Sequence, residues 1–594
     1  MCGIYTSISK KETLCSEFLV SLKELEYRGY DSAGITILDK NKYKTYKTLK
    51  KISDLKSKIP KLNSSKLIMG HTRWATHGEP NLRNCHPHVL GNLSIVHNGV
   101  VENYEEIKNS KYLKKIKLKT ETDTEVILQL IKFFNYSNSF LNSILKTFSI
   151  VKGSNAFICS KISDNSNEVI ACKYNTPLYY GQKINGDNIF SSDINAMKKS
   201  LKGYRYIEND EFIYIENNKP KIFCINKIRK KLILKRIENT DQNINKKIKK
   251  NITYNEIKEQ KKLISNHIFR VDNISNIIKK IPKPKEIVII GCGSSYNAGL
   301  LGKIFFEENT DIPTSVYRPS EFNYFSNNKK KLFIFMSQSG ETADVCTLLE
   351  SNRDFFKNSL SLVNNNDSRL VRESKNSINL AVGIEQGVAA TKTFSSQIIT
   401  LNIISKLFNK KKDKENILLP KKSLLNKVFK LEKNIKEIAK KFYKNKNFFV
   451  LGRNYNFPIA TEAALKIKEI AYIHAEGALS SEIKHGPIAL FDKDFPVVLL
   501  ISNKVETVHS EIASLNEIVS RTRNVLVIAP EKVINKLNLK IRSKLETISV
   551  PESEDDIMPI SYLIVLQLFS YHLAKFKKLP IDQPRNLAKV VTVE

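Results

Sequence analysis

The chain has 594 residues, of which 41% are hydrophobic and 26% are charged. This length is enough for three or four ordinary domains, and the apolar fraction is enough to give each a packed core. The formal net charge of +36 would by itself favour a partner such as nucleic acid or an anionic membrane. The lysines are spread along the whole chain among many Asn and Ile residues, so we expect neither partner and interpret the densest basic run, Lys246–Lys250, as a solvated connector.

The sequence lacks the patterns of a membrane span, an export signal and a metal-binding cysteine pair. Ile560–Ala574, the longest apolar stretch near the end, is interrupted by polar residues and is too short to cross a bilayer. The first residues, MCGIYTSISKK, lack the basic segment and apolar run of a secretory signal. The eight cysteines form no C-x-x-C pair, so we expect no zinc site, no dithiol redox motif and a reduced, cytoplasmic setting.

In chain order, the first part of the sequence mixes short β-rich runs with loops. Residues 2–218 contain such runs at Leu67–Gly70, Leu93–His97 and Asn155–Cys159. From residue 219 to residue 277 the chain is polar and lysine-rich, with little of the alternation that a half-buried strand shows. We therefore predict a first domain over 2–218, followed by a linker that carries some helix.

The second half contains an internal repeat of apolar runs. Successive starts are separated by 45, 27 and 19 residues in a first set of four runs and by 49, 27 and 24 residues in a second set. Apolar strands separated by helical segments are typical of parallel sheets covered on both faces. The runs are Ile287–Ile290, Leu332–Phe335, Ser359–Val363 and Ile378–Ala381, then Phe448–Leu451, Val497–Leu500, Asn524–Ile528 and Ile548–Val550.

The repeat predicts two copies of one doubly wound α/β domain, at 278–415 and 440–582, followed by a short tail over 583–594. Ligands of such folds bind beyond the carboxyl ends of the strands. In the first copy the turns 291–296 and 337–342 follow strands and are rich in glycine and hydroxyl residues. Turns of this kind at helix N-termini bind anions, although an ordinary helix cap has a similar composition.

Two such turns on adjacent strands favour a phosphate site. Neither has the third glycine of a dinucleotide fingerprint or the Gly-Lys-Ser/Thr of a P-loop. The matching turns of the second copy, Gly452–Tyr455 and Ser502–Thr507, have lost most of this character. We therefore expect the phosphate site in the first copy only.

These residues resemble a known domain. Ser337–Thr342 and the strand–turn pattern around it resemble the sugar isomerase (SIS) domain that binds phosphosugars. The tandem pair, with the terminal motifs Asp582–Lys589 and Val591–Glu594, is similar to the isomerase half of the glutamine–fructose-6-phosphate aminotransferase family.

Cys2 is a candidate nucleophile at the other end of the chain. Once Met1 is removed, Cys2 carries a free α-amino group, whose ordinary pKa of about 8 is close to the value of about 8.5 for a thiol. That amine can act as the general base for the thiol, so no histidine partner is required. A cysteine at position 2 is weak evidence alone, because initiator methionine is removed before many small residues.

Several neighbouring motifs resemble the class II glutamine amidotransferase domain over residues 2–218. This resemblance implies an Ntn-hydrolase-type α+β glutaminase sandwich, placed before the two parallel-sheet SIS domains in an α/β protein. Together the two resemblances cover nearly the whole chain. The motifs are Tyr27–Asp31, His71–Gly78, Val96–Gly99 and Glu121–Glu125.

The resemblance assigns roles in the glutaminase site. Asn98 and Gly99 would form the oxyanion hole. Arg73 would clamp the glutamine α-carboxylate, a bidentate role suited to guanidinium, and Asp123 would pair with its ammonium group. Trp74, the single tryptophan, would gate the channel that carries ammonia, although a lone tryptophan is more often a core residue. The remaining glutamine-binding positions are Arg28, Thr76 and His77.

The resemblance also assigns roles in the isomerase site. Glu469 would shuttle a proton between adjacent carbons, with Lys466 beside it, and His485 would open the sugar ring. Lys589 would form a Schiff base with the ketose. From the residues alone, Lys466 and Glu469, at i and i+3 of a helical segment over 460–476, are equally typical of a surface ion pair. The sugar-phosphate contacts would be Cys292, Gly293, Ser294, Ser295, Ser337, Gln338, Ser339, Thr342, Val388, Lys466 and Ala588.

The sequence departs from the family pattern at a few positions. Ala390 replaces a serine and removes one hydroxyl contact, and Lys261 replaces a proline of the linker. Tyr5-Thr6 and Ser480-Ser481 replace smaller pairs near the nucleophile and the ring-opening histidine. These changes concern affinity and channel fit, because each leaves the catalytic groups in place.

The expected reaction is fructose 6-phosphate plus glutamine giving glucosamine 6-phosphate plus glutamate, without metal, nucleotide or pyridoxal phosphate. A homodimer is what the resemblance implies. One alternative is a related enzyme that acts on another sugar phosphate, and a second is a non-catalytic phosphosugar-binding regulator. The histidines 71, 77, 86 and 88 lie in loops without a carboxylate partner pattern, so we expect no metal site there.

Overall fold

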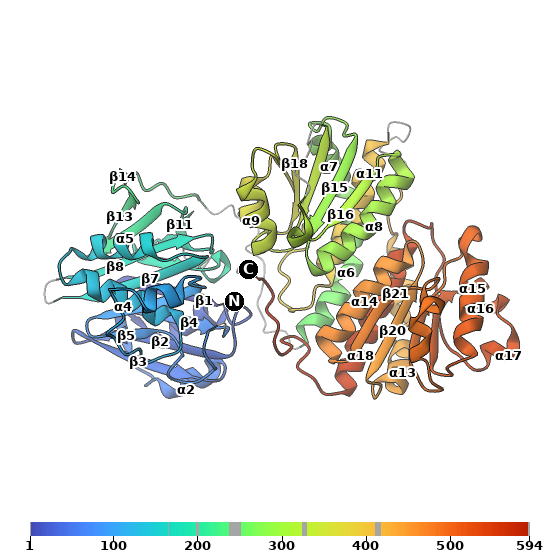
Figure 1. Cartoon of the computed structure of the whole chain (residues 1–594), viewed down its shortest axis with the longest axis horizontal. Helices are drawn as coiled ribbons and strands as arrows, with labels where there is room; N and C mark the ends of the chain where they lie inside the picture. Colours follow the sequence, from blue (N-terminus) through green and yellow to red (C-terminus); the bar gives the residue numbers. More distant parts are fainter. Residues whose placement is uncertain are drawn as a thin grey trace. The chain divides into compact units, whose positions relative to one another are not determined.

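The computed structural model describes residues 2–75, 77–163, 166–197, 201–236, 251–323, 330–409 and 417–591. The chain forms two compact units, residues 1–245 with 590–594, and residues 246–589, and each is described by itself (Figure 1). The basic run Lys246–Lys250, the predicted site residue Thr76 and the terminal residues 592–594 lie outside the described residues.

The first unit contains two seven-stranded sheets whose paired strands run antiparallel. The first sheet has the order β11-β9-β10-β1-β4-β2-β3, with β1 paired to both β10 and β4. Its strands are β1 Gly3–Leu14, β2 Ser32–Asp39, β3 Lys42–Thr48, β4 Ser64–Arg73, β9 Tyr179–Lys183, β10 Asn188–Ser191 and β11 Leu201–Tyr206.

The second sheet has the order β14-β13-β12-β8-β7-β6-β5. The polar segment that begins at residue 219, predicted as linker, starts with two strands of this sheet, because β13 pairs along its whole length with β12. The strands are β5 His88–Leu90, β6 Leu93–Gly99, β7 Asn155–Ile162, β8 Asn167–Tyr174, β12 Glu211–Glu216, β13 Lys219–Cys224 and β14 Arg229–Lys230.

Alternating side chains explain why the two sheets stack. In β1, Ile4 and Ile8 enter the core between the sheets, whereas Tyr5 faces the core under α1. In β7, Ile158 joins the inter-sheet core and Phe157 packs under α4 and α5. Period-2 alternation on both sheets therefore gives a helix–sheet–sheet–helix sandwich. Its helices are α1 Cys15–Lys23, α2 Ile52–Lys58, α3 Tyr104–Lys108, α4 Asp123–Asn135 and α5 Phe140–Ile150.

The second unit begins with two helices and contains two parallel five-stranded sheets of equivalent order, β16-β15-β17-β18-β19 and β21-β20-β22-β23-β24. The predicted tandem of doubly wound domains is confirmed. The strands are β15 Glu286–Gly291, β16 Thr314–Tyr317, β17 Lys331–Met336, β18 Ser359–Val363, β19 Asn376–Asn379, β20 Asn447–Gly452, β21 His474–Leu479, β22 Val497–Leu500, β23 Val525–Pro530 and β24 Glu546–Val550.

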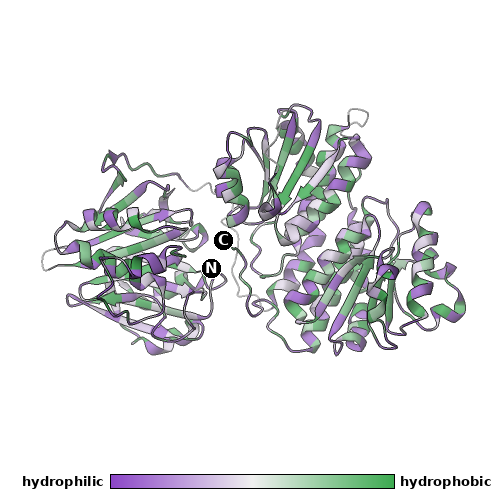
Figure 2. Cartoon of the chain, viewed as in Figure 1, coloured by the Kyte–Doolittle hydropathy of each residue, from purple (hydrophilic) through white to green (hydrophobic). Residues whose placement is uncertain are grey.

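Helices cover both faces of each parallel sheet, so its strands are apolar on both sides (Figure 2). In β15, Ile287 and Ile289 join one core and Val288 joins the core on the opposite face. The first of these cores continues through α14 and α18, so the two copies share it. The helices are α6 Ile252–Ser265, α7 Val271–Ile278, α8 Gly293–Thr310, α9 Ala343–Ser351, α10 Arg369–Glu373, α11 Lys392–Phe408, α12 Lys422–Lys430, α13 Glu432–Phe442, α14 Asn456–Ala471, α15 Val505–Val519, α16 Glu531–Lys536, α17 Leu539–Arg542 and α18 Met558–Phe576.

The sequence prediction missed one strand in each copy, and one predicted helix is too long. The edge strands β16 and β21 both lie beside the first strand of their sheet. The helix predicted over 460–476 ends at Ala471, because Tyr472 takes a left-handed conformation with φ 53°. Glu476 therefore lies in β21, where it pairs with Phe449 of β20.

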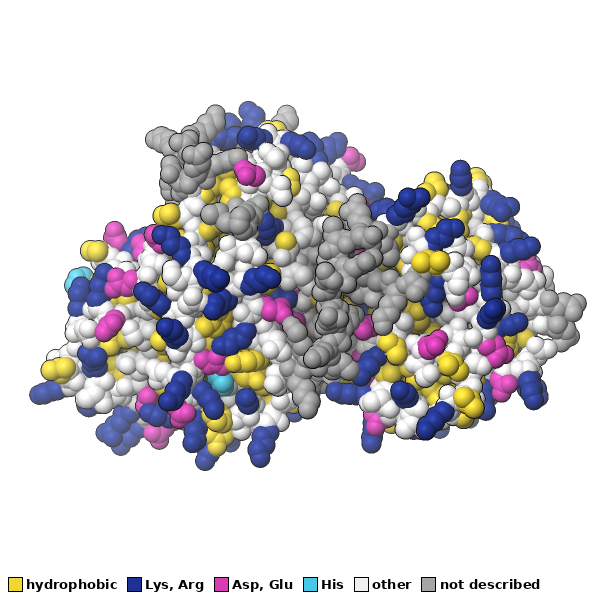
Figure 3. All heavy atoms as spheres, turned by 180° about the vertical axis from the view of Figure 1, so that it is seen from behind, with side chains coloured by type: hydrophobic (Ala, Val, Ile, Leu, Met, Phe, Trp, Pro, Cys, Tyr) yellow, Lys and Arg dark blue, Asp and Glu magenta, His cyan; other side chains and the backbone are white. Residues whose placement is uncertain are grey.

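Two further features are the distribution of charged side chains on the surface and the length and apolarity of the helices. Lysine and arginine side chains are spread over the face seen in Figure 3, among hydrophobic and neutral ones, and form no single patch there. Among the described helices, none is long and apolar enough to cross a membrane.

Candidate functional site

Cys2 lies immediately before β1, beside the end of β4. The Trp74 N–H donates to the Cys2 Sγ at 3.3 Å, and the thiol lies 3.4 Å from the Trp74 carbonyl oxygen. The Cys2 carbonyl accepts hydrogen bonds from the Arg28 Nε at 3.2 Å and from the Asn98 Nδ2 at 3.0 Å. Burial raises the pKa of the Cys2 thiol, and the Trp74 N–H and the Arg73 charge oppose this effect. The thiolate therefore depends on a nearby base and on these donors.

Asn98 and Gly99 end β6 next to Cys2. Gly99 has a φ of +127°, and a Cβ built there would lie 2.0 Å from the Ser154 carbonyl oxygen. Only glycine fits this position, which lets the backbone come close to a reacting group. The Asn98 Oδ1 is buried without a hydrogen-bond partner among the described residues, whereas its Nδ2 already points at Cys2.

A cation and a carboxylate lie in the same part of this unit. The buried Arg73 guanidinium donates to the carbonyl oxygens of His77, Gly78 and Glu79, so it orders the loop that follows Trp74. The buried Asp123 accepts the Val101 N–H at 2.9 Å. A fixed cation and a fixed carboxylate suit the two charged groups of a free α-amino acid.

Other glutaminase positions are also placed. The Nδ1 of His77 lies 4.0 Å from an Asp123 carboxylate oxygen. Trp74 is half-buried and packs edge-on against Tyr30, with the ring centroids 5.6 Å apart. It is therefore not a core residue, which leaves the gate hypothesis open.

Four histidines close to the site are buried, at positions 71, 86, 88 and 97. The His86 Nε2 and the His97 Nδ1 both contact the Thr124 hydroxyl, at 2.7 and 2.9 Å, and His71 and His86 stack with centroids 4.3 Å apart. Burial lowers the pKa of His71 to about 3 and places the pKa of His86 and His88 well below the ordinary value. They are neutral structural groups, and no metal-binding cluster is found among the described residues.

In the second unit, the predicted phosphate loop follows β17. The Ser337 hydroxyl contacts the Thr342 hydroxyl at 2.8 Å and accepts the Gly340 N–H at 3.0 Å, and the Ser339 hydroxyl accepts the Glu341 N–H at 3.1 Å. Gly340 has a φ of +67°, and a Cβ there would lie 2.1 Å from the Ser368 Oγ. The loop is a tight hydroxyl-lined turn at the N-terminus of α9.

The second predicted turn follows the adjacent strand β15. The Ser295 hydroxyl accepts a bond from the Gln397 Nε2 at 2.9 Å, and Gly293 has a φ of +52° with open space where a Cβ would stand. Burial raises the pKa of Cys292 to about 12, so this thiol lines the turn in its protonated form. Both turns thus lie at the carboxyl edge of one sheet.

Lys466 and Glu469 form an ion pair in which Lys466 is buried and Glu469 is half-buried, so it is not a surface pair. Lys466 is 2% exposed and forms ion pairs with Glu469 and, at 3.4 Å, with Glu462. The Ser294 hydroxyl donates to Glu462 at 2.9 Å, which joins this cluster to the β15 turn. Glu462 was missed from the sequence, although its i, i+4 spacing from Lys466 placed both on one helix face.

Burial raises the pKa of Glu462, and Glu469 adds to this effect. Burial lowers the pKa of Lys466, but Glu462 and Glu469 outweigh it, so the net pKa lies above the ordinary value. The buried Lys466 ammonium group is thus paired with two carboxyl groups, those of Glu462 and Glu469.

The C-terminal lysine has a buried carboxylate partner. The Lys589 Nζ lies 2.6 Å from the Glu385 Oε2, with side chains that are 3% and 0% exposed. Glu385 also accepts the Thr391 N–H, the Thr393 N–H and the Thr393 hydroxyl, at 3.1, 3.0 and 2.9 Å. Burial acts to raise the pKa of Glu385, but Lys589 and these donors hold it at about 2. No local sequence signal marked Glu385, which lies 204 residues from Lys589.

The remaining predicted positions are not all brought together. His485 lies in the exposed 3₁₀ turn Ile483–His485, and among the described contacts it bonds neither Glu469 nor Lys589. The Val388 N–H donates to the Asp582 carbonyl at 3.3 Å, and the Gln338 carbonyl accepts the Asn364 N–H at 3.1 Å. Ala588 precedes Lys589 and is half-buried.

The second copy differs at its matching turn. The Ser502 and Thr507 hydroxyls keep their contact, at 3.1 Å, but the buried Glu511 carboxylate accepts both the Ser502 N–H at 2.9 Å and the Ser502 hydroxyl at 3.3 Å. A side-chain anion therefore occupies the donors that a bound anion would require.

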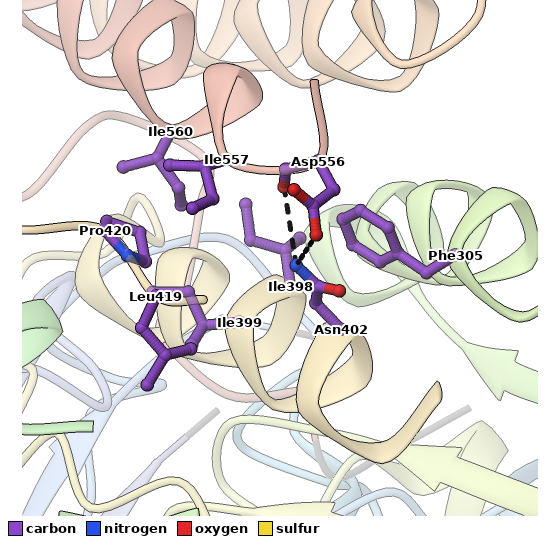
Figure 4. A pocket seen from close by; sticks show the side chains of 9 residues that line it. All are labelled: Phe305, Ile398, Ile399, Asn402, Leu419, Pro420, Asp556, Ile557 and Ile560. Carbon is purple, nitrogen blue, oxygen red and sulfur yellow. Dashed lines mark hydrogen bonds between the residues drawn. The ribbon is translucent and has the colours of Figure 1, made fainter. Parts of the chain in front are cut away.

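Two cavities of the second unit contain none of these groups. A small cavity between α8, α11 and α18 is lined by Phe305, Ile398, Asn402 and Asp556, among others (Figure 4). The Asn402 Nδ2 donates to the Asp556 carboxylate at 3.1 Å there. An open groove beside α12 and β24 also contains none of the predicted site residues.

Comparisons with known proteins agree with this division. The SIS domain family matches residues 280–405 and 441–575, and the glutamine amidotransferase domain family matches residues 53–244. The fold and site thus define an amidotransferase sandwich with an N-terminal cysteine, joined to tandem SIS domains.

Full-length relatives identify the family. Glutamine–fructose-6-phosphate aminotransferase (isomerizing) from Aquifex aeolicus is 37% identical over 607 residues, and that from Francisella tularensis is 35% identical over 621 residues, each match covering 100% of both chains. The solved C-terminal domain of glucosamine-fructose-6-phosphate aminotransferase from Francisella tularensis is 34% identical, with a TM-score of 0.51, and covers 57% of this chain and 98% of that chain. The chain belongs to the glutamine–fructose-6-phosphate aminotransferase (isomerizing) family of enzymes.

Proposed function

We propose that the protein converts D-fructose 6-phosphate and L-glutamine into D-glucosamine 6-phosphate and L-glutamate, the first step of hexosamine biosynthesis. One observation carries the proposal. A single chain holds a cysteine nucleophile beside Arg73 in one unit and a buried lysine, Lys589, in the other. Such a pair supplies nitrogen at one site and activates a ketose at the other.

In the glutaminase step, the Cys2 Sγ attacks the side-chain amide carbon of glutamine. The free α-amino group of the processed chain takes the thiol proton and delivers it to the leaving nitrogen, which departs as ammonia. Water then hydrolyses the thioester to glutamate and regenerates the thiol. The Asn98 amide and the Gly99 N–H stabilise the oxyanion of both tetrahedral intermediates, a role worth about 3 kcal/mol per donor in other enzymes.

In the isomerase step, His485 opens the sugar ring and neutral Lys589 attacks the C2 carbonyl. A C=N bond forms and the carbonyl oxygen leaves as water. Ammonia then displaces the lysine from C2, and Glu469 moves a proton from C1 to C2. The carbonyl group ends at C1 and the amino group remains on C2.

The phosphate group of the sugar is proposed to bind the Ser337–Thr342 loop and the neighbouring β15 turn. Hydroxyl groups and helix N-termini at the carboxyl edge of one sheet support this assignment. Glu511 supports the restriction to the first copy, because its carboxylate would repel a phosphate at the equivalent turn.

Ammonia must remain neutral to attack C2, so its path has to exclude water. We assign Trp74 as the gate of that path. The half-buried position of its ring, packed edge-on against Tyr30 and beside Cys2, supports this role.

We also propose that the protein is a cytoplasmic homodimer. The resemblance to the aminotransferase family supports the dimer, and the exposed position of His485 leaves this side chain accessible to a second copy. The cysteines of the described residues are all free thiols, which fits a reducing compartment.

A product assay tests the function. Purified protein with fructose 6-phosphate and glutamine should form glucosamine 6-phosphate and glutamate in equal amounts. Turnover of another sugar phosphate in place of fructose 6-phosphate would instead indicate a related enzyme. Binding of fructose 6-phosphate without any product would indicate a regulator.

A further inference from the structure

Helix α6, which lies within the segment predicted as linker, is bonded directly to the C-terminal tail. The Asp582 carboxylate accepts the N–H groups of Ile252 and Thr253, at 2.9 and 2.8 Å, and so caps the first turn of α6. The Asp582 carbonyl accepts the Val388 N–H at 3.3 Å. The tail that carries Lys589 is therefore held by α6 and by the loop 385–388 together.

A buried carboxylate of α6 completes this connection. Glu256 is 4% exposed, and its oxygens accept the Gln386 N–H at 2.5 Å and the Gly387 N–H at 3.2 Å. The approach is so close that a Cβ on Gly387 would lie 2.7 Å from the Glu256 Oε2. Glu256 thus holds the backbone of the loop whose first residue, Glu385, is the ion-pair partner of Lys589.

We propose that Glu256 is a positioning residue for imine formation, which holds loop 385–388 and, through its own protonation, decides whether Lys589 faces one or two negative charges. This inference rests on the proposed role of Lys589 as the imine-forming lysine. It assigns to the interdomain helix a direct part in the sugar site.

The charges around Glu256 support this assignment. Burial and the Glu385 charge raise the pKa of Glu256 to about 7. Lys589, the Gln386 N–H and Lys392 act in the opposite direction and lower it, but by less. Lys392, at the start of α11, is paired with Glu259 at 2.9 Å and so brings little net charge. On the other side of α6, Lys258 pairs with Glu432.

The chemistry follows from charge balance. Lys589 must lose a proton before its Nζ can form a C=N bond. With Glu256 neutral, Lys589 and Glu385 form one balanced ion pair. When Glu256 ionises, a second negative charge stabilises the ammonium form of Lys589, because opposite charges attract each other more strongly in a buried site. Ionised Glu256 therefore opposes imine formation, and neutral Glu256 permits it.

The test is imine trapping as a function of pH. Full-length protein, with fructose 6-phosphate and without glutamine, is treated with cyanoborohydride between pH 6 and pH 9.5, and the sugar adduct is measured by intact mass. Glu256→Gln keeps an oxygen for the loop N–H groups but carries no charge, so the pH midpoint of trapping should fall by about one pH unit. Glu256→Asp keeps the charge with a shorter reach, so it should keep the wild-type midpoint while kcat falls about tenfold.

A matched control is Glu511→Gln, which removes another buried carboxylate whose pKa is raised to about 7, in the second copy. Its trapping midpoint should equal that of the wild type. A Glu256→Gln midpoint equal to the wild-type value, or a midpoint displaced equally in Glu511→Gln, would overturn the role of Glu256. Absence of any adduct in the wild type, or an adduct that persists in Lys589→Ala, would instead overturn the lysine assignment of the proposed function.

Discussion

At the residue scale, two lysines of the second unit have the same kind of surroundings. Lys466 lies between Glu462 and Glu469, and Lys589 lies beside Glu385 with Glu256 close enough for their charges to interact. In each group one carboxyl has a raised pKa because burial disfavours a second negative charge. In both groups the raised pKa makes the carboxyl easier to protonate than an exposed one, and in the Lys589 group the value for Glu256 is about 7.

The first prediction belongs to Lys589. Lys589→Ala should prevent trapping of fructose 6-phosphate on the protein by borohydride, because no other buried amine is assigned to C2. It should also leave the Glu385 carboxylate buried without its cation, which costs about 3–5 kcal/mol of stability. Intact mass measures the adduct, and thermal melting measures the stability. Undiminished trapping would exclude this lysine.

At the element scale, the turns that follow β17 and β22 of the two parallel sheets differ in what their hydroxyl groups bond. In the first copy, the turn after β17 offers its hydroxyl groups at the N-terminus of α9. In the second copy, Glu511 of α15 fills the equivalent donors after β22. The hydroxyl groups of the first turn therefore bond one another and nearby N–H groups, whereas those of the second turn also bond a carboxyl group of the chain.

The second prediction concerns Glu511 and pH. Burial raises its pKa to about 7 in the folded protein, against the opposing bonds from Ser502, whereas the unfolded value is about 4.3. Between these two pH values the folded state binds more protons than the unfolded state. The contribution of Glu511 to the free energy of unfolding is therefore full below pH 4.3 and is lost as the pH rises through 7. The cost above pH 7 is about 4 kcal/mol.

Glu511→Gln should remove this cost. Its melting temperature should exceed that of the wild type by several degrees at pH 8 and match it at pH 5. Glu506→Gln, which changes an exposed carboxylate on the same helix, should show no such dependence on pH. An equal change at both pH values would mean that Glu511 acts through packing and not through its charge.

At the scale of the whole molecule, the chain separates two chemistries into two units, each with its own core. The third prediction follows from this separation. Cys2→Ala should abolish glutamine hydrolysis, because the nucleophile is lost, while the interconversion of fructose 6-phosphate and glucose 6-phosphate stays measurable. Glutaminase and isomerase assays on the same preparation test this, and equal loss of both activities would contradict independent sites.

Much of the architecture and of the candidate site could be predicted from local pattern. Apolar runs at repeated spacing predicted the tandem parallel sheets, and the hydroxyl-rich turns were correctly placed after strands β15 and β17. The edge strands β16 and β21 escaped this reasoning because they are short and half polar. The end of α14 escaped it because a non-glycine residue, Tyr472, takes the left-handed conformation there.

The sequence by itself determined the order of the domains and the strand and helix periods, and it predicted Cys2 as the nucleophile, because these depend on neighbouring residues. Only the tertiary structure decided that Glu385 is the partner of Lys589, that Lys466 is buried, and that Glu256 of the linker segment reaches loop 385–388. The contacts of Glu385 with Lys589 and of Glu256 with Gln386 join residues 204 and 130 positions apart. Burial and long-range charge, which set their chemistry, exist only once the chain has folded.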